Sequence, residues 1–139
     1  MISRQGLGDI EASLRRAYDR DYPLVNALAK NDIPIPKAYR STFDYILNAD
    51  LIKCFGPDRI SIKSLERIAA EMKRWNMTIE DPKAVERRAG DGIYNELKRI
   101  QAEPDNAKRI QRLNRLFHIL EEFKLEPNLY RCQNLYFEM

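Results

Sequence analysis

Seven prolines divide this chain of 139 residues and constrain every fold that it can adopt. A proline lacks the backbone N–H that helices and strands use and restricts the residue before it, so prolines tend to mark helix edges. They stand at Pro23, Pro34, Pro36, Pro57, Pro82, Pro104 and Pro127. From Pro36 onward, the segments between prolines have similar lengths and carry apolar residues at helical spacing. The pattern predicts a series of helices joined by short connectors.

The apolar residues and the local capping residues place these helices more closely. We expect a helix over about 9–20, a shorter one after Pro23 and an extended connector over 31–36. Further helices are expected after Pro36, near Ser61 with its hydroxyl as cap, after an Asp81 cap with Pro82 at the first position, and from Pro104 to before Pro127. In the last three, the residues expected to face inward are Leu65, Ile68, Ala69, Met72 and Trp75; Val85, Ala89, Ile93, Leu97 and Ile100; and Ile110, Leu113, Leu116, Phe117, Leu120 and Phe123.

The fold class follows from these helices and from the length. No segment shows the strict apolar and polar alternation of a half-buried strand, and 139 residues suit one domain. We therefore predict an all-α fold over residues 1–139, as a single compact antiparallel helical bundle of about five to seven helices. The aromatic segment 128–139 is expected to dock on this bundle, because a free tail rarely carries so many large apolar side chains. No residue pattern recurs with the prolines, which favours a closed bundle over a solenoid.

Composition excludes several functional classes. Hydrophobic residues make up 44% of the chain, charged residues make up 32%, and the net charge is +3. This suits a folded soluble domain, and no apolar run is long enough for a membrane span or a secretory signal, so we expect a cytoplasmic protein without a membrane partner. Cys54 and Cys132 are interpreted as reduced, buried thiols.

The sequence offers no arrangement of catalytic or metal-ligating residues. His118 and the two cysteines lack the spacing of a zinc site. The neighbouring acids Glu121 and Glu122 diverge on a helix, so they do not form an acid/base pair across a cleft. We therefore predict no catalytic residue, no cofactor and no metal ion.

A basic helix face is one candidate interaction site. Lys108, Arg112 and Arg115 follow each other at i, i+4 and i+7, with Arg109 adjacent, and such a stripe can hold phosphates or an acidic partner. The alternative is a solvated face that nearby acids such as Glu103 balance. The modest net charge and the lack of a nucleic-acid-binding motif argue against nucleic acid as the main partner.

Aromatic residues are the other candidate contacts. Sugar rings stack on Trp and Tyr, so Trp75, Tyr130 and Tyr136, with the neighbouring amide of Asn134, are candidates for carbohydrate or domain contact. The helical spacing favours the alternative for Trp75, a core residue in line with Ile68 and Met72.

A family resemblance enters at the end of the chain. The stretch 125–137, with a leucine, asparagine and aromatic run that leads to Gln133-Asn134-Leu135-Tyr136, resembles the closing motif of a helical domain of unknown function. That domain lies C-terminal to the catalytic part of some family 57 glycoside hydrolases. Three further stretches agree with it: Ile33-Pro34-Ile35-Pro36, Tyr45-Ile46-Leu47-Asn48-Ala49-Asp50-Leu51 and Met72-Lys73-Arg74-Trp75.

The resemblance implies an accessory region of an enzyme of the α-amylase or α-mannosidase type. The catalytic Glu and Asp of that family belong to a preceding barrel that this sequence does not contain, so no catalytic residue is carried over. The expected chain is then a C-terminal fragment of a larger enzyme, with the catalytic domain of the same parent chain as partner and polysaccharide as a further contact. The alternative is a helical interaction adaptor that binds an acidic protein or nucleic acid through the basic face. An independent enzyme would require a deep pocket with convergent polar groups.

Overall fold

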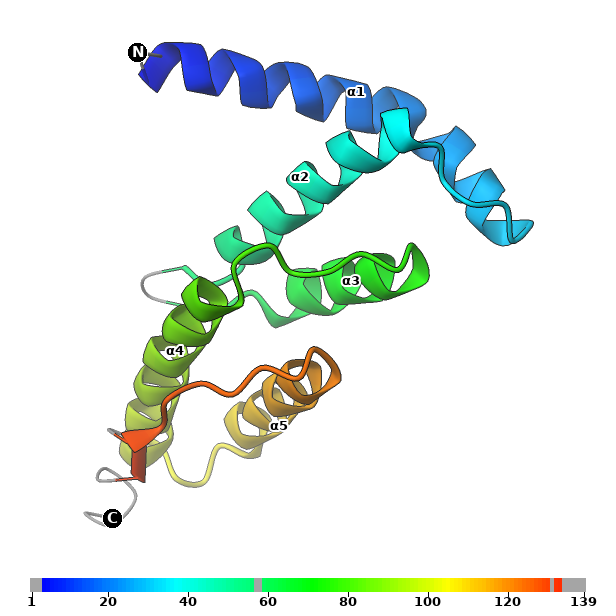
Figure 1. Ribbon diagram of the computed structural model, residues 1–139. Coiled ribbons are helices and arrows are strands. Elements are labelled where there is room, and N and C mark those ends of the chain that lie inside the picture. The colour runs from blue at the N-terminus through cyan, green and yellow to red at the C-terminus, as the bar shows by residue number, and fades with distance from the viewer. Residues whose placement is uncertain (1–3, 57–58, 131, 134–139) are drawn as a thin grey trace.

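The computed structural model describes residues 4–56, 59–130 and 132–133, and these residues form five helices without a strand (Figure 1). The helices are α1 (Arg4–Lys30), α2 (Lys37–Lys53), α3 (Ile62–Arg74), α4 (Pro82–Ala102) and α5 (Ala107–Glu122). An isolated bridge joins Phe55 and Ile60. The predicted all-α class is confirmed, with a helix number at the low end of the expected range.

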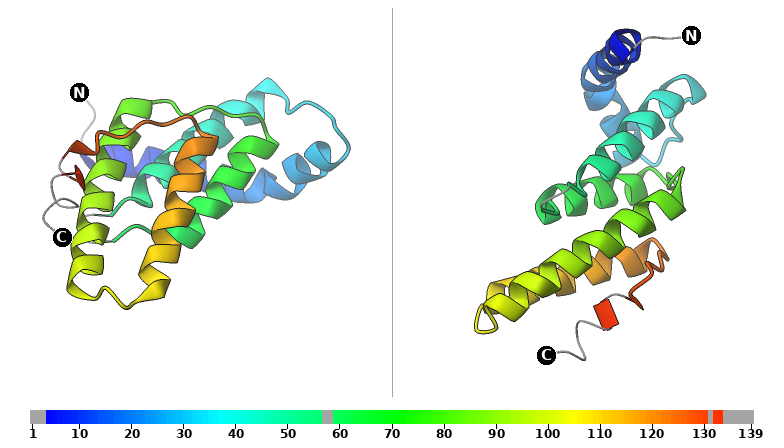
Figure 2. Two further views of the ribbon diagram at one scale, coloured as in Figure 1. Left: turned by 90° about the horizontal axis from the view of Figure 1, so that it is seen from below. Right: turned by 90° about the vertical axis from the view of Figure 1, so that its left-hand side faces the viewer.

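The helices form a layered stack. α1 packs against α2, α2 against α3, α3 against α5, and α5 against α4. Figures 1 and 2 show α1 at one end of the stack and α4 with α5 at the other, and the segment after α5 returns along α4. The closed antiparallel bundle stays a prediction.

The first helix corrects the sequence interpretation. The expected break at Pro23 is absent, because α1 runs through it as one helix of 27 residues. Proline removes one backbone hydrogen bond, and packing on both sides of it offsets that loss, since Tyr18 and Val25 are both buried. Figure 1 shows the helix bending in its C-terminal half, which contains Pro23.

The helix starts follow the predicted caps in part. Asp81 caps α4 as expected: its carboxylate accepts from the Ala84 N–H at 3.2 Å, and Pro82 occupies the first turn. Ser61 stands at the predicted N-cap position of α3, but its hydroxyl makes no capping hydrogen bond. The last helix begins at Ala107, after Asn106, and not at Pro104.

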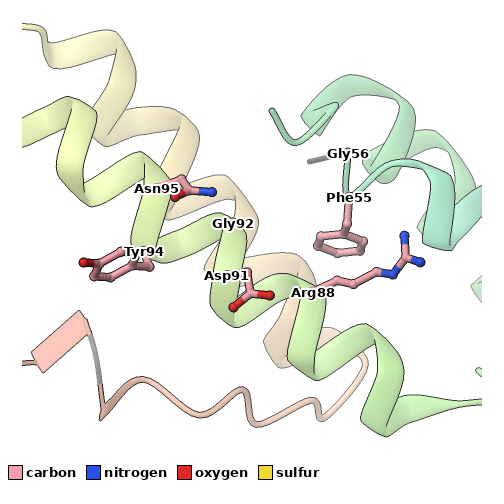
Figure 3. Close-up of a pocket in the computed structure, with 7 residues that line it drawn as sticks. All are labelled: Phe55, Gly56, Arg88, Asp91, Gly92, Tyr94 and Asn95. Carbon is pink, nitrogen blue, oxygen red and sulfur yellow. The ribbon is translucent and has the colours of Figure 1, made fainter. Parts of the chain in front are cut away.

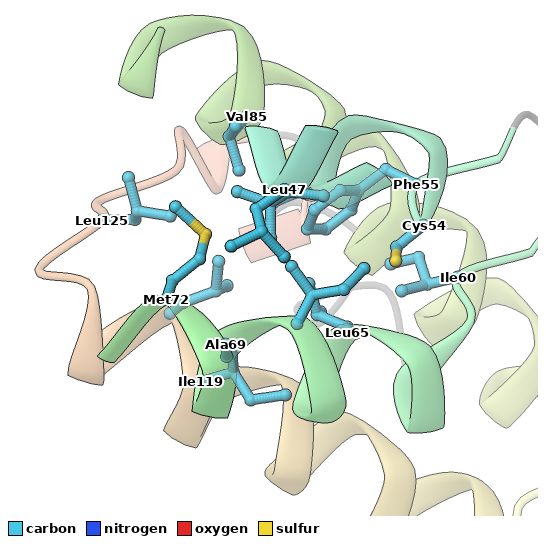
Figure 4. Close-up of a cluster of buried hydrophobic side chains, with 14 of the residues drawn as sticks. Leu47, Cys54, Phe55, Ile60, Leu65, Ala69, Met72, Val85, Ile119 and Leu125 are labelled. Atoms are coloured by element: carbon cyan, nitrogen blue, oxygen red, sulfur yellow. The ribbon is translucent and has the colours of Figure 1, made fainter. Parts of the chain in front are cut away.

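The buried apolar core includes residues of all five helices, with Tyr18 and Val25 from α1. We call its part that joins α2, α3, α4 and α5 the apolar cluster (Figure 4). Its side chains point toward one another from all four helices and from Leu125 in the returning segment. The inward face predicted for α3 is confirmed in full, as are Val85, Ala89 and Ile93 of α4. On α5, Leu113, Leu116 and Leu120 are buried as predicted.

Two inward predictions on α5 are wrong. Ile110 and Phe117 are 43% and 38% exposed, because the helix packs through a narrower stripe than its apolar residues define. Ile110 and Phe117 lie two turns apart on a face that turns away from this stripe.

Two glycines allow α4 to pack closely against neighbouring parts of the chain. A Cβ at Gly92 would come within 2.8 Å of Ile60 Cγ1, and one at Gly90 would come within 3.1 Å of the Asn128 carbonyl oxygen. The first contact brings the chain before α3 against α4, and the second brings the returning segment there.

A second packed region, the α1 interface, joins α1 to α2 and α3. Four rings meet there: Tyr18, Tyr22, Phe43 and Trp75. The buried carboxylate of Glu71 accepts from the Tyr18 hydroxyl at 3.0 Å and from the Tyr22 hydroxyl at 2.6 Å. This region therefore combines aromatic packing with a buried polar group.

Candidate functional site

Two adjoining hollows lie where the start of α3, the C-terminal half of α4 and α5 meet. One measures about 400 Å³ and the other about 500 Å³, and both are lined by Arg59 and Arg112. We call the pair the basic cleft. Among the residues that the structure describes, its walls carry one carboxylate, Glu96, and seven cations: Arg59, Lys63, Arg99, Lys108, Arg109, Arg112 and Arg115.

The three predicted basic residues of α5 all line this cleft. Arg112 and Arg115 line the first hollow, and Lys108 and Arg112 line the second. The half-buried Arg112 is fixed across the cleft, because its Nη2 donates to the Ile60 carbonyl oxygen at 2.9 Å. Arg115 is held from another direction by an ion pair with Glu66 of α3. The spacing on α5 thus identified one wall of the site.

Three cations of the cleft were missed at the sequence level. Arg59 and Lys63 flank the start of α3, and Arg99 lies near the end of α4. Arg59 and Lys63 are separated from α5 by α4, and Arg99 lies on a different helix from Arg112, so no helical spacing relates any of them to Arg112. Only the packing of α3 and α4 against α5 brings these residues together.

Glu96 fixes part of the cleft wall. This carboxylate is only 6% exposed, and its Oε1 accepts from Arg99 Nη1 at 2.8 Å. Its Oε2 lies 4.0 Å from Arg109 Nη1 and has no hydrogen-bond partner in the part of the chain that the structure describes. A buried carboxylate is retained when cations compensate it, so Glu96 fixes Arg99. Arg109 makes its hydrogen-bonded ion pair with Glu103, with 3.3 Å between Nε and Oε2.

The remaining cations give the cleft its excess positive charge. Across the described ranges, four of the seven have no carboxylate at ion-pair distance: Arg59, Lys63, Lys108 and Arg112. The first turn of α3 lines the same hollow, so the positive end of its dipole adds to their field. A concave surface with cations of this kind concentrates anions from solution.

A third hollow, of about 540 Å³, lies between α4 and the end of α2 (Figure 3). Figure 3 shows Phe55 next to Arg88 and Asp91 of α4, whereas Tyr94 points away from Phe55. Arg88 cannot serve as a proton acceptor at neutral pH. The hollow brings one carboxylate, one guanidinium group and one phenol into the same lining: Asp91, Arg88 and Tyr94.

The predicted aromatic contacts differ in their exposure. Trp75 is 3% exposed and packs against the rings of Tyr22 and Phe43, so its interpretation as a core residue is confirmed and no face is open to a sugar. Tyr130 is 68% exposed. Asn134 and Tyr136 lie outside the described residues.

The other sequence candidates form no reactive cluster. His118 is exposed and pairs with Glu122, with 3.2 Å between Nε2 and Oε1. Cys54 and Cys132 are buried free thiols. Within residues 4–56, 59–130 and 132–133, no group of three or more His, Cys, Asp or Glu residues is placed to hold a metal ion.

Comparisons with family models, with curated proteins and with solved structures found no significant match. Of the helices in the described part of the chain, none combines the length and the apolar character that crossing a membrane requires.

Proposed function

We propose that the chain is a noncatalytic accessory domain of a family 57-like glycoside hydrolase and packs on the catalytic barrel of the same parent chain in the cytoplasm. In this proposal the five helices act as one compact antiparallel unit. The observation that carries it is the role of the residues behind the family resemblance. Several of them, among them Asn48, Asp50 and Leu125, hold the helices together, as a supporting domain requires.

Asn48 is one such residue. Its side chain is buried, its Nδ2 donates to the Thr78 carbonyl oxygen at 3.2 Å, and its Oδ1 accepts from the Glu80 N–H at 2.8 Å. These bonds attach α2 to the loop before α4. Asp50, in the same stretch, forms an ion pair with Arg15 of α1. Both residues thus connect elements that are distant in sequence.

The segment after α5, which carries the closing motif, also contributes to the packing. Leu125 and Cys132 are 8% and 5% exposed, and the Asn128 carbonyl oxygen lies close to Gly90 of α4. The segment with the closing motif is therefore part of the packed fold over its described residues. The exposed Tyr130 on this segment is available for contact with a barrel or a polysaccharide.

The reading frame that encodes this chain tests the proposal. We expect a hydrolase barrel upstream in the same frame, and a frame without one would overturn the proposal. Direct contact with glucan is tested by calorimetric titration with maltooligosaccharides. Binding that Tyr130→Ala abolishes and Tyr45→Ala preserves would support contact, because Tyr45 is an exposed tyrosine on α2. The absence of binding at millimolar ligand would leave only the packing role.

The basic cleft favours a second candidate function, an interaction adaptor that binds an anionic partner. Among the described residues that line the cleft, seven cations face one carboxylate, and Glu66 and Glu103 pair with two of these cations from beside it. Reversing Arg112 and Arg115 to Glu is expected to abolish capture of an acidic partner. Arg16→Glu is the matched control, because Arg16 is exposed on α1 at the other end of the stack. Unchanged capture by the double variant would exclude this function.

A further inference from the structure

We propose that the basic cleft binds a ligand with two or more phosphate groups. The proposal rests on the second candidate function, anion binding at this cleft, and adds the chemical class of the ligand. Its starting point is the arrangement of the two hollows. They are not separate sites, because Arg59 and Arg112 line both.

The lining of the two hollows indicates how many anionic groups a well-fitting ligand carries. A single small anion in either hollow meets Arg59 and Arg112 but leaves Lys63 or Lys108 without a counter-charge, since Lys63 lines only the first hollow and Lys108 only the second. A ligand with two or more anionic groups contacts the shared arginines and both lysines. The cleft therefore fits a polyanion better than one ion.

The kind of cation favours phosphate. Five of the seven cations are arginines. The planar guanidinium group of an arginine can donate two parallel N–H hydrogen bonds to two oxygens of one phosphate. Arg112 uses one N–H on the Ile60 carbonyl oxygen, which orients the group and leaves its other donors for a ligand. A phosphate group offers up to two charges and three acceptor oxygens, so adjacent phosphates match closely spaced cations better than carboxylates on separate residues do.

Glu96 is a positioning residue in this proposal. Its buried carboxylate holds Arg99 at the wall of the second hollow, with 2.8 Å between Oε1 and Nη1. Arg109 lies 4.0 Å from Glu96 and is held by Glu103, with 3.3 Å between Nε and Oε2. These arginines are therefore ordered before a ligand arrives, which lowers the entropic cost of binding.

The direct test compares inorganic triphosphate with inorganic phosphate in calorimetric titrations at one ionic strength. We expect triphosphate to bind at least about tenfold more tightly, because it can bridge both hollows. Lys63→Glu and Lys108→Glu should each weaken triphosphate binding by about tenfold or more. Both lysines are exposed and unpaired within the described residues, so the variants should keep the circular dichroism spectrum of the parent. Arg16→Glu, the same loss of charge outside the cleft, should leave binding unchanged.

One further probe identifies the source of the phosphates. A single-stranded oligothymidylate that binds more tightly than triphosphate points to nucleic acid, and one that binds more weakly points to a small polyphosphate or nucleotide. Either result supports phosphate binding at the cleft, provided that Lys108→Glu weakens the binding of the probe.

The proposal is overturned if triphosphate binds no more tightly than phosphate. It is also overturned if Arg16→Glu weakens triphosphate binding as much as Lys108→Glu does. A pentaglutamate peptide that binds as tightly as triphosphate, and loses affinity in Lys108→Glu, would overturn the phosphate assignment while anion binding at the cleft stands. If no polyanion binds, both the assignment and the adaptor function fail. The accessory-domain proposal depends on the reading frame and is untouched by these titrations.

Discussion

The apolar cluster and the α1 interface are held together by different chemistry. In the cluster, the side chains of Leu47, Leu65 and Leu116 are each 1% exposed. Figure 4 shows Leu47 and Leu65 among other apolar side chains. In the α1 interface, aromatic rings surround the buried carboxylate of Glu71, which two tyrosine hydroxyls satisfy. The apolar packing of the cluster is non-directional and shared by four helices, whereas the α1 interface combines apolar packing, such as that of Val25, with oriented hydroxyl and carboxylate groups. We infer that α1 opens separately, before the rest of the stack unfolds.

Leu47→Ala breaks the apolar cluster and has the largest expected effect. Loss of a fully buried leucine leaves a cavity and should lower the free energy of unfolding by about 2–5 kcal/mol. Because four helices share the cluster, denaturant melting should shift for the whole protein. Leu24→Ala is the matched control: Leu24 is 48% exposed on α1, so its loss should change stability by less than about 0.5 kcal/mol. Equal effects of the two variants would contradict the location of the core.

Glu71→Ala tests the α1 interface. It removes the acceptor of two hydroxyls, which should cost about 1–3 kcal/mol, mostly in the docking of α1. Hydrogen exchange should become about 10-fold to 100-fold faster in the α1 amides, while the α5 amides change little. Glu66→Ala is the control, because Glu66 is on the same helix but pairs with Arg115 of α5. Equal acceleration in α1 and α5 would show that α1 does not open by itself.

Alkaline pH should weaken the same interface. Burial is the largest cause that raises the pKa of Tyr18, followed by the charge of Glu71. The hydrogen bond to Glu71 is the largest cause that raises the pKa of Tyr22, followed by burial. Both hydroxyls are thus neutral in the docked state, while a released tyrosine ionises near pH 10. Their contribution is therefore complete below pH 10 and is lost as the pH rises above it, by up to about 1.4 kcal/mol per pH unit for Tyr18.

The measurement is α1 exchange between pH 8 and 11, corrected for the intrinsic exchange rate. Burial raises the pKa of the Cys54 thiol to about 11, so this thiol would weaken the apolar cluster in the same range. A Cys54→Ala background removes that effect. In this background, Tyr18→Phe should flatten the pH dependence of α1 opening. If Tyr18→Phe leaves the pH dependence of α1 exchange unchanged, ionisation of Tyr18 is not what weakens the α1 interface.

The sequence predicted the apolar cluster well because helical period and burial coincide there. Leu65, Ile68 and Met72 follow the stripe of α3, and all three are buried. The break predicted at Pro23 failed, because a local rule for proline does not include the packing of Tyr18 and Val25 on either side.

The α1 interface and the basic cleft were less predictable for a common reason. Glu71 lies 49 residues from Tyr22 in sequence, and Arg112 lies 52 residues from the Ile60 carbonyl that orients it. A single helix shows the spacing of its own residues, such as Lys108 and Arg112. It does not show which residues of another helix will face them, since that depends on the packing of the stack.

The ends of α1 and α5 offer the smallest and most specific comparison. Asp32 after α1 and Lys124 after α5 both adopt the left-handed conformation, with φ of 56° and 57°. The following N–H closes the helix in each case: Ile33 donates to the Leu28 carbonyl oxygen at 2.9 Å, and the N–H after Lys124 makes the same bond at 2.9 Å. Glycine adopts this conformation without strain, whereas lysine tolerates it less well than aspartate.

Lys124→Gly should therefore raise the free energy of unfolding of the whole protein by about 0.5–1 kcal/mol. Asp32→Gly should gain only about 0.3 kcal/mol or less, because aspartate already tolerates the left-handed region. The stabilisation by Asp32→Gly should slow hydrogen exchange in α1 and leave the denaturant midpoint unchanged, because α1 opens before the apolar cluster unfolds. Denaturant melting and exchange on the two variants provide the measurement. A midpoint that rises equally in both would mean that α1 and the apolar cluster unfold as one unit.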